Sequence, residues 1–196
     1  MTEELKVRPG SDALIIVDVQ RDFCPGGALA APHGDEVVPA LNRWLAIPGL
    51  FKVATRDWHP PNHCSFDVRG GPWPAHCVAG TPGAEFHPDL DIARVDKVVS
   101  KATEPDAEAY SGFDAPELAR TLHDHEIHRV WIGGLATDYC VKATTVDACT
   151  HGFTTFVLTD VVSGIDAKPG DVEKAFKEMG EAGACLTETE NVRTER

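Results

Sequence analysis

A-L-I-I-V-D at residues 13–18 is the stretch that decides the fold class. Its first five residues are apolar without interruption, and Ile15, Ile16 and Val17 are β-branched. A short continuous apolar run of this kind predicts a strand that is buried on both faces, as the strands of parallel sheets are. Asp18 then places a carboxylate at the end of the strand, where ligands bind in open α/β sheets.

Strand and helix patterns alternate along the rest of the chain. After the first strand we expect strands at residues 51–56, 97–100, 129–133, 154–159 and 184–186, and helices at residues 35–45, 116–123, 138–150 and 169–179. This alternation predicts right-handed crossovers and therefore an α/β protein with a parallel sheet. The sequence shows no internal repeat, linker or low-complexity run, so we expect a single domain over residues 1–196.

Composition argues against several classes of partner. The formal net charge is −13, and a field of that sign repels phosphate groups, so we expect no nucleic-acid and no membrane partner. The first ten residues carry mixed charges and lack an apolar signal core, which favours a cytoplasmic location. The six cysteines form no C-x-x-C pair, so most of them are expected to be buried packing residues rather than zinc ligands.

Residues 57–91 interrupt the alternation. The segment holds six prolines and several glycines with little periodicity, and it also holds many aromatic and histidine side chains. A long irregular stretch inside a compact domain is usually functional or disordered. The aromatic and histidine side chains predict that this one is ordered and functional.

Polar residues collect where the expected strands end. Asp18 closes the first strand, Asp57 and His59 follow the second, Lys101 follows the third, and Cys140 follows the fourth. Periodicity leaves the strand order open. In the doubly wound order 3-2-1-4-5-6, strands one and four flank the switch point at which ligands bind, and Asp18 would then face Cys140.

Cys140 is a candidate nucleophile because it lies in the first turn of an expected helix. Backbone N–H groups and the positive end of the helix dipole stabilise a thiolate there, and a nearby Lys101 would lower the thiol pKa further. Asp18 could move the proton, and the N–H groups of Ala136 and Cys140 could stabilise an oxyanion. The residues alone leave open that Cys140 packs in the core, that Asp18 caps a turn and that Lys101 is a surface charge.

Asp57 and His59 are candidate metal ligands, because residues i and i+2 of an extended segment point the same way. His76 could supply a third ligand, and His63 a fourth ligand or only a supporting group. Two histidines, a carboxylate and open positions suit Zn(II), Fe(II) or Mn(II). The alternative is that these are solvated loop histidines, since the chain has nine histidines.

Five motifs, taken in order, resemble the isochorismatase-like cysteine hydrolases and, within them, the nicotinamidase (pyrazinamidase) branch. The motifs are D-V-Q-R-D-F-C-P-G-G-A-L (18–29), T-R-D-W-H-P-P-N-H-C-S-F (55–66), W-P-A-H-C-V-A-G-T-P-G-A-E-F-H (73–87), K-A-T-E-P-D-A-E-A-Y-S-G-F (101–113) and G-L-A-T-D-Y-C-V-K-A-T (134–144). The resemblance implies a doubly wound, six-stranded parallel sheet in the order 3-2-1-4-5-6, with helices on both faces. It also implies hydrolysis of nicotinamide to nicotinic acid and ammonia through a cysteine thioester, in NAD salvage, with pyrazinamide as a second substrate.

The same resemblance implies a role for each motif residue. It implies one divalent metal ion and a cis peptide bond between Leu135 and Ala136. The implied sets are a triad of Asp18, Lys101 and Cys140, an oxyanion site of Ala136 and Cys140, metal ligands Asp57, His59 and His76 with His63 less constant, and pocket walls Phe23, Trp73, Tyr110 and Tyr139.

Two other functions remain possible at this point, and each would need a different set of the candidate residues. A metal-free relative that acts on isochorismate or on a carbamoyl or ureido amide would not need the three metal ligands together. A non-catalytic metal-binding protein would not need the triad. The sequence also allows a homo-oligomer, and it predicts that Cys149, nine residues after Cys140, faces away from the site.

Overall fold

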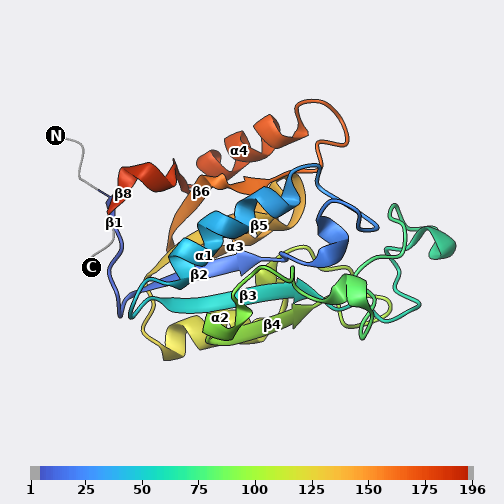
Figure 1. Ribbon diagram of the computed structural model, residues 1–196, viewed down its shortest axis with the longest axis horizontal. Coiled ribbons are helices and arrows are strands. Elements are labelled where there is room, and N and C mark those ends of the chain that lie inside the picture. The colour runs from blue at the N-terminus through green and yellow to red at the C-terminus, as the bar shows by residue number, and fades with distance from the viewer. Residues whose placement is uncertain (1–4, 194–196) are drawn as a thin grey trace.

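A six-stranded parallel sheet forms the centre of the computed structural model, which describes residues 5–193 (Figure 1). The strands are β2 (Asp12–Val17), β3 (Phe51–Asp57), β4 (Lys97–Lys101), β5 (Arg129–Leu135), β6 (Thr154–Ser163) and β7 (Cys185–Thr187). They lie in the order β4-β3-β2-β5-β6-β7, and every neighbouring pair is parallel. This arrangement confirms the expected order 3-2-1-4-5-6. The expected single domain also includes residues 1–4 and 194–196, which lie outside the described part.

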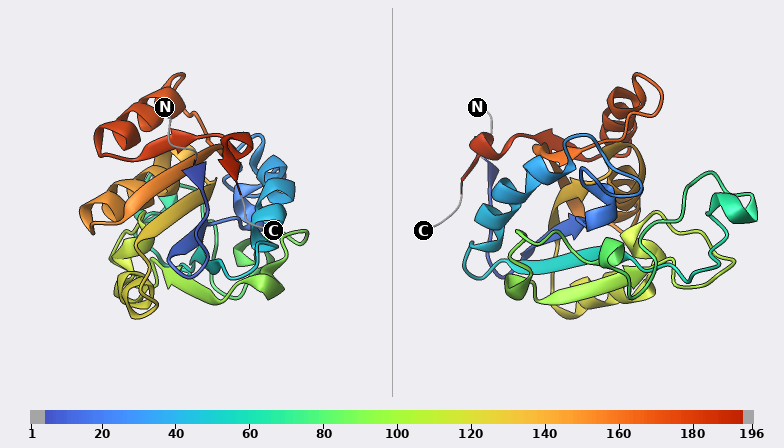
Figure 2. Two further views of the ribbon diagram at one scale, coloured as in Figure 1. Left: turned by 90° about the vertical axis from the view of Figure 1, so that its left-hand side faces the viewer. Right: turned by 45° about the vertical axis from the view of Figure 1, so that its right-hand side comes forward.

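The side chains of β2 explain why helices cover both faces of the sheet. All six residues of β2 are buried. Leu14 and Ile16 belong to one hydrophobic cluster, whereas Ala13, Ile15 and Val17 belong to the other. The first cluster is covered by α1 (Val38–Leu45), and the second by α2 (Pro116–Asp124), α3 (Lys142–Thr150) and α4 (Asp171–Glu181), as Figure 2 shows.

Three helices begin differently from the expectation. The expected helix at 35–45 starts with a 3₁₀ turn, Gly34–Val37, so that α1 begins only at Val38. The expected helix at 138–150 starts with a π-helical turn, Thr137–Val141, because the Ala136 carbonyl accepts hydrogen bonds from the N–H groups of both Tyr139 and Val141. The last helix begins at Asp171 and not at residue 169. Gly170 precedes it with a φ of 98°, a left-handed conformation that favours glycine.

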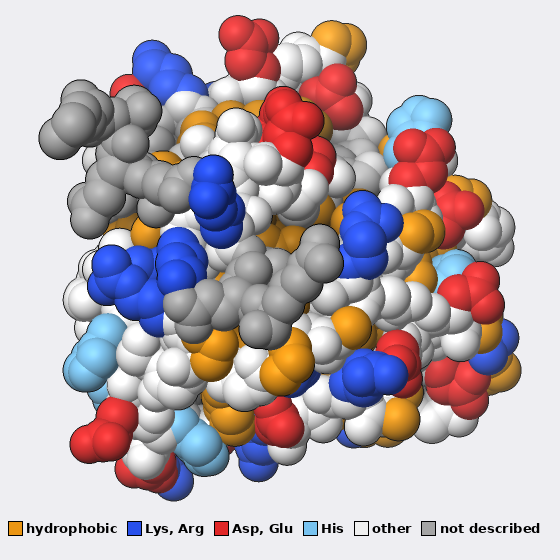
Figure 3. Space-filling view, turned by 60° about the vertical axis from the view of Figure 1, so that its left-hand side comes forward, with side chains coloured by type: hydrophobic (Ala, Val, Ile, Leu, Met, Phe, Trp, Pro, Cys, Tyr) orange, Lys and Arg blue, Asp and Glu red, His pale blue; other side chains and the backbone are white. Residues whose placement is uncertain are grey.

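The two ends of the described chain meet in a second, small sheet. β1 (Leu5–Lys6) pairs in parallel with β8 (Val192–Arg193), and neither strand is among those expected from the sequence. Two residues are too few to show a periodicity. On the face near these ends, acidic and basic side chains are interspersed (Figure 3). Within residues 5–193, none of the helices has the length and apolar character that crossing a bilayer would require.

The first part of the segment 57–91 projects beyond the carboxyl ends of the strands (Figure 1), whereas its last residues return to pack beside α1. Short 3₁₀ turns at Asp67–Arg69 and Pro82–Ala84 shape the segment. Isolated β-bridges join His59 to Val78 and Gln20 to Phe86, and Phe66 is fully buried. The segment is therefore held against the same edge of the sheet at which the strand-end polar residues lie.

Candidate active site

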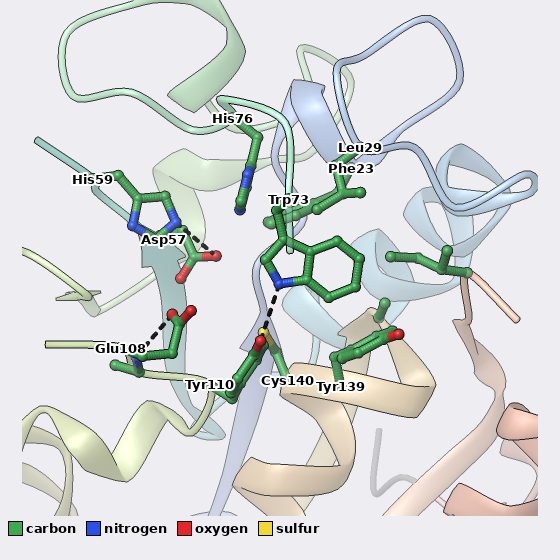
Figure 4. Close-up of a pocket in the computed structure, with 13 residues that line it drawn as sticks. Phe23, Leu29, Asp57, His59, Trp73, His76, Glu108, Tyr110, Tyr139 and Cys140 are labelled. Carbon is green, nitrogen blue, oxygen red and sulfur yellow. Dashed lines mark hydrogen bonds and ion pairs between the residues drawn. The ribbon is translucent and has the colours of Figure 1, made fainter. Parts of the chain in front are cut away.

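The carboxyl ends of four neighbouring strands bring the predicted residues together. Asp18 follows β2, Asp57 ends β3, Lys101 ends β4 and pairs with Asp57 in register, and Cys140 lies in the turn after β5. Residues from β3, from the 57–91 segment and from the turn after β5 face one cavity (Figure 4). The parallel topology therefore assembles a site from segments that are far apart in the sequence.

The Lys101 ammonium lies between the Asp18 and Asp57 carboxylates and contacts both of them. Its Nζ lies 3.0 Å from Oδ2 of Asp18 and 3.4 Å from Sγ of Cys140, and it also contacts Oδ1 of Asp57. A further contact, of 3.3 Å, joins Nζ to the Ala109 carbonyl. Lys101 and Asp18 are both buried, so these interactions are little screened by water.

Burial and charge set the protonation states of these groups. Burial alone would lower the pKa of the Lys101 ammonium, but the Asp18 and Asp57 carboxylates outweigh it and hold that pKa well above its usual range. For Asp57, burial opposes ionisation, yet the charge of Lys101 lowers the pKa below its usual value. For Asp18, burial dominates over Lys101 and raises the pKa. Asp18 is therefore the carboxyl group best suited to receive a proton.

The environment of Cys140 differs from the one expected. Burial raises the pKa of its thiol well above the usual range, even though Lys101 acts in the opposite direction. The prediction of a lowered thiol pKa was wrong, because a position at a helix start does not reveal that the side chain is only 6 % exposed. The thiol is therefore protonated at rest, and a nucleophilic role would require a neighbouring group that takes its proton. Asp18 can receive it, since Thr55 Oγ1 fixes the carboxylate by donating to Oδ1 at 2.7 Å.

The turn before Cys140 has the backbone form that the resemblance implied. The peptide bond between Leu135 and Ala136 is cis. Gly134, with a φ of 122°, lies so close to β2 that a β-carbon there would be 2.2 Å from the Val17 carbonyl oxygen. Ala136 and Cys140 line the same cavity. Their proposed role as oxyanion donors is compatible with this placement.

Asp57, His59 and His76 can hold a metal ion. Their candidate ligand atoms all lie within 4.8 Å of one another. Nδ1 of His59 lies 3.3 Å from the Ala102 carbonyl and Nδ1 of His76 lies 2.8 Å from the Pro74 carbonyl, which leaves both Nε2 atoms available. His59 Nε2 is buried without a hydrogen-bond partner, 3.5 Å from Oδ2 of Asp57. An unpartnered imidazole nitrogen beside a carboxylate and a second imidazole fits a divalent cation.

His63 lies next to this group but has other partners. Its Nδ1 is 2.7 Å from Oγ of Ser65, and its Nε2 is 3.0 Å from the Ala107 carbonyl. The His63 ring lies 4.2 Å from the His59 ring, measured between centroids. His63 is therefore placed to support His59, and a ligand role for it would require the Ala107 contact to break.

The cavity above Cys140 has mostly apolar walls, and together with the open space at its mouth it comprises about 370 Å³. Trp73 donates from Nε1 to the Tyr110 hydroxyl at 3.0 Å and meets the Tyr139 ring edge-on at 5.0 Å (Figure 4). All four predicted wall residues line the cavity. Four further residues that line the cavity were not predicted from the sequence, namely Leu29, Glu108, Ala109 and Ile165.

Gln20 also supports the site without having been predicted to do so. Its fully buried side chain accepts a hydrogen bond from the Asp57 N–H at 2.8 Å and donates to the carbonyls of Asp57 and Ala84 at 2.8 and 2.9 Å. Glutamine is usually exposed, so its type gave no signal of this role. Gln20 fixes the backbone that carries the candidate metal ligand.

Gln20→Ala is expected to lower the free energy of unfolding by about 3 kcal/mol, because three buried backbone groups lose their partners. Urea denaturation measures the loss, and zinc affinity should weaken as well. The matched control is Asn42→Ala, which removes a partly exposed amide that bridges Asp89 and Asp91. It should lower the free energy of unfolding by about 1 kcal/mol. Equal losses in the two variants would contradict the role given to Gln20.

The isochorismatase domain profile matches residues 12–191. The chain belongs to the isochorismatase family. Among its relatives in the family, the nicotinamidase of Escherichia coli is 40% identical over 198 residues, covering 89% of this chain and 93% of the relative. The crystal structure of the Pyrococcus horikoshii pyrazinamidase in complex with zinc has 52% identity and a TM-score of 0.84, covering 91% and 99% of the two chains. The structure of PnC1 from L. infantum in complex with nicotinate has 35% identity and a TM-score of 0.93, covering 97% and 99%.

Proposed function

We propose that this protein is a nicotinamidase that hydrolyses nicotinamide to nicotinic acid and ammonia in NAD salvage, and that it also deamidates pyrazinamide. The observation that carries the proposal is the meeting of Cys140, Lys101 and Asp18 beneath an aromatic cavity that also holds a metal-ligand group. An aromatic cavity suits a flat ring better than an open-chain carbamoyl amide. The names of the similar proteins from E. coli and P. horikoshii agree with these substrates.

The charged groups define the chemical steps. Cys140 Sγ attacks the carboxamide carbon while its proton passes to Asp18, and the N–H groups of Ala136 and Cys140 stabilise the oxyanion. Asp18 then gives the proton to the leaving nitrogen, ammonia departs, and a thioester remains. A water molecule, deprotonated by Asp18, cleaves the thioester and restores the thiol. Lys101 orients Asp18 and keeps the thiol and carboxyl groups in one hydrogen-bonded set.

A single divalent cation is the expected cofactor, with Zn(II) or Fe(II) preferred and Mn(II) as a further candidate. Asp57, His59 and His76 would hold it, and His63 would support His59. When bound, the cation offers an electrophilic position for the ring nitrogen of the substrate. A reducing compartment such as the cytoplasm suits the protein, since all six cysteines are free and Cys140 must stay a thiol.

The direct test is release of ammonia together with formation of nicotinic acid from nicotinamide, followed by chromatography. Pyrazinamide should give pyrazinoic acid in the same assay. Isochorismate and an N-carbamoyl amide serve as competing substrates. Turnover of either competitor in preference to nicotinamide would overturn the proposal.

A further inference from the structure

One wall of the cavity is anchored from inside the turn that carries the nucleophile. Ile165, in the loop after β6, lines the cavity. The Ile165 N–H donates to Oδ1 of Asp138 at 3.0 Å, and the Asp166 N–H donates to Oδ2 at 2.8 Å. Asp138 lies two residues before Cys140 and is 5 % exposed. A single buried carboxylate therefore joins this wall to the Cys140 turn, although Asp138 itself does not line the cavity.

Close packing and a second anchor restrict the loop on either side of Ile165. A β-carbon at Gly164 would lie 2.3 Å from Cγ2 of Val172 and 3.0 Å from the anchoring carboxylate, so the loop is already in close contact there. On the other side, Asp166 Oδ1 accepts hydrogen bonds from the N–H groups of Gly170 and Val172 at the start of α4. Ile165 is thus held between two fixed points.

The aromatic walls are held in a different way. Trp73, Tyr110 and Tyr139 contact one another through a hydrogen bond and ring packing. Ile165 packs against the hydrophobic cluster beneath α1, and the carboxylate of Asp138 holds its backbone. The Ile165 wall can therefore be displaced without disturbing the contacts among the three aromatic residues or those of Lys101.

We propose that Ile165 limits the size of the ring substituents that the cavity accepts, and that Asp138 is a positioning residue that sets this limit through the loop. The inference rests on the proposed function, because it concerns the same cavity. One methyl group more or less in an apolar pocket changes discrimination by roughly 10–200-fold. Shortening the Ile165 side chain, or releasing its loop from Asp138, should therefore change the ratio of kcat/KM between substrates of different size.

The quantity to measure is kcat/KM for a ring-methylated nicotinamide divided by kcat/KM for nicotinamide, with the methyl group at each ring carbon in turn. Ile165→Ala should raise this ratio about tenfold for at least one methyl position. Asp138→Asn replaces one acceptor oxygen with a donor, so one loop N–H loses its partner. It should raise the ratio at the same methyl position by about threefold or more. Because Asp138 acts through Ile165, the double variant should shift the ratio no further than Ile165→Ala alone.

The matched control is Asp160→Asn. Asp160 accepts a hydrogen bond from the Thr189 N–H at 2.9 Å and contacts the Thr189 hydroxyl. Here too a carboxylate fixes a turn through a backbone N–H, but this turn does not line the cavity. Its ratio should stay at the wild-type value. An Asp138→Asn protein that loses thermal stability but keeps the wild-type ratio would overturn the positioning role. An unchanged ratio in Ile165→Ala would overturn the whole inference. If Asp138→Asn does not fold, Gly164→Ala displaces the same loop, and an unchanged ratio in that variant counts against the positioning role.

Binding measurements separate this inference from the proposed function. Calorimetry gives Kd for nicotinate and for its ring-methylated forms, and the ratio of these constants tests the wall without turnover. A wild-type protein that binds nicotinate but releases no ammonia from nicotinamide would refute the proposed function alone. A wild-type protein that binds no pyridine carboxylate would refute both.

Discussion

Cys140→Ala is expected to abolish hydrolysis of nicotinamide, with kcat/KM falling on the order of 10⁴-fold or more. In the proposed mechanism the sulfur attacks the amide carbon, and its neighbours Asp18 and Lys101 cannot replace it, because each is proposed to move or hold a proton. Ammonia release under excess nicotinamide measures the loss.

The fold and the metal-ligand group should survive that change. Asp57, His59 and His76 come from β3 and the segment after it, so zinc content should match that of the wild type. The matched control is Cys149→Ala, which removes a half-buried thiol from the cluster on the α2–α4 face and should retain activity. Substantial turnover by Cys140→Ala, or loss of turnover in Cys149→Ala without loss of stability, would contradict the thioester route.

The metal-loaded protein is expected to favour nicotinamide over benzamide by on the order of a hundredfold in kcat/KM. Benzamide has the same shape but lacks the ring nitrogen. The aromatic walls Trp73, Tyr110 and Tyr139 should accept both rings, so the preference should depend on the cation held by Asp57 and the two histidines. Chelation should lower turnover of nicotinamide and reduce its advantage over benzamide.

Refilling the chelated protein with Zn(II), Fe(II) or Mn(II), each followed by metal analysis, completes this experiment. His76→Ala is the matched variant, because it removes one ligand while leaving the hydrogen bonds of Lys101 in place. It should bind zinc more weakly in calorimetry. Equal rates with the two amides, or no effect of chelation on either rate, would remove the orienting role from the cation.

Strands of the sheet were predictable where a local sequence pattern marked them. They were not predictable where contacts between residues distant in the sequence determine the structure. The apolar run before Asp18 marked the central strand, and alternation of strands and helices marked a parallel sheet. Strand order came from the family resemblance and not from periodicity. β1 and β8 escaped notice because each has two residues. The π-helical turn forms because the Ala136 carbonyl accepts two hydrogen bonds. No residue type in this stretch predicts such an arrangement.

The site shows the same division. Asp18, Asp57, Lys101 and Cys140 were predictable because parallel strands share one carboxyl edge. Gln20, Asp138 and Ile165 were not, because the functions given to them here arise from hydrogen bonds to a backbone or from a wall position. The pKa of Cys140 was predicted in the wrong direction, since burial is a property of the whole fold.

The central place of β2 has a consequence for the newly made chain. β2 is synthesised first among the six strands of the large sheet, and β3 can pair with it early, but its other neighbour, β5, begins only at Arg129. Until the ribosome has delivered β5, one edge of β2 is an open row of backbone groups that can pair wrongly. Cys140 follows β5 directly, so its thiol reaches Asp18 only as that edge closes. The pair to which the proposed mechanism assigns the proton transfer is therefore assembled late in translation, together with completion of the sheet.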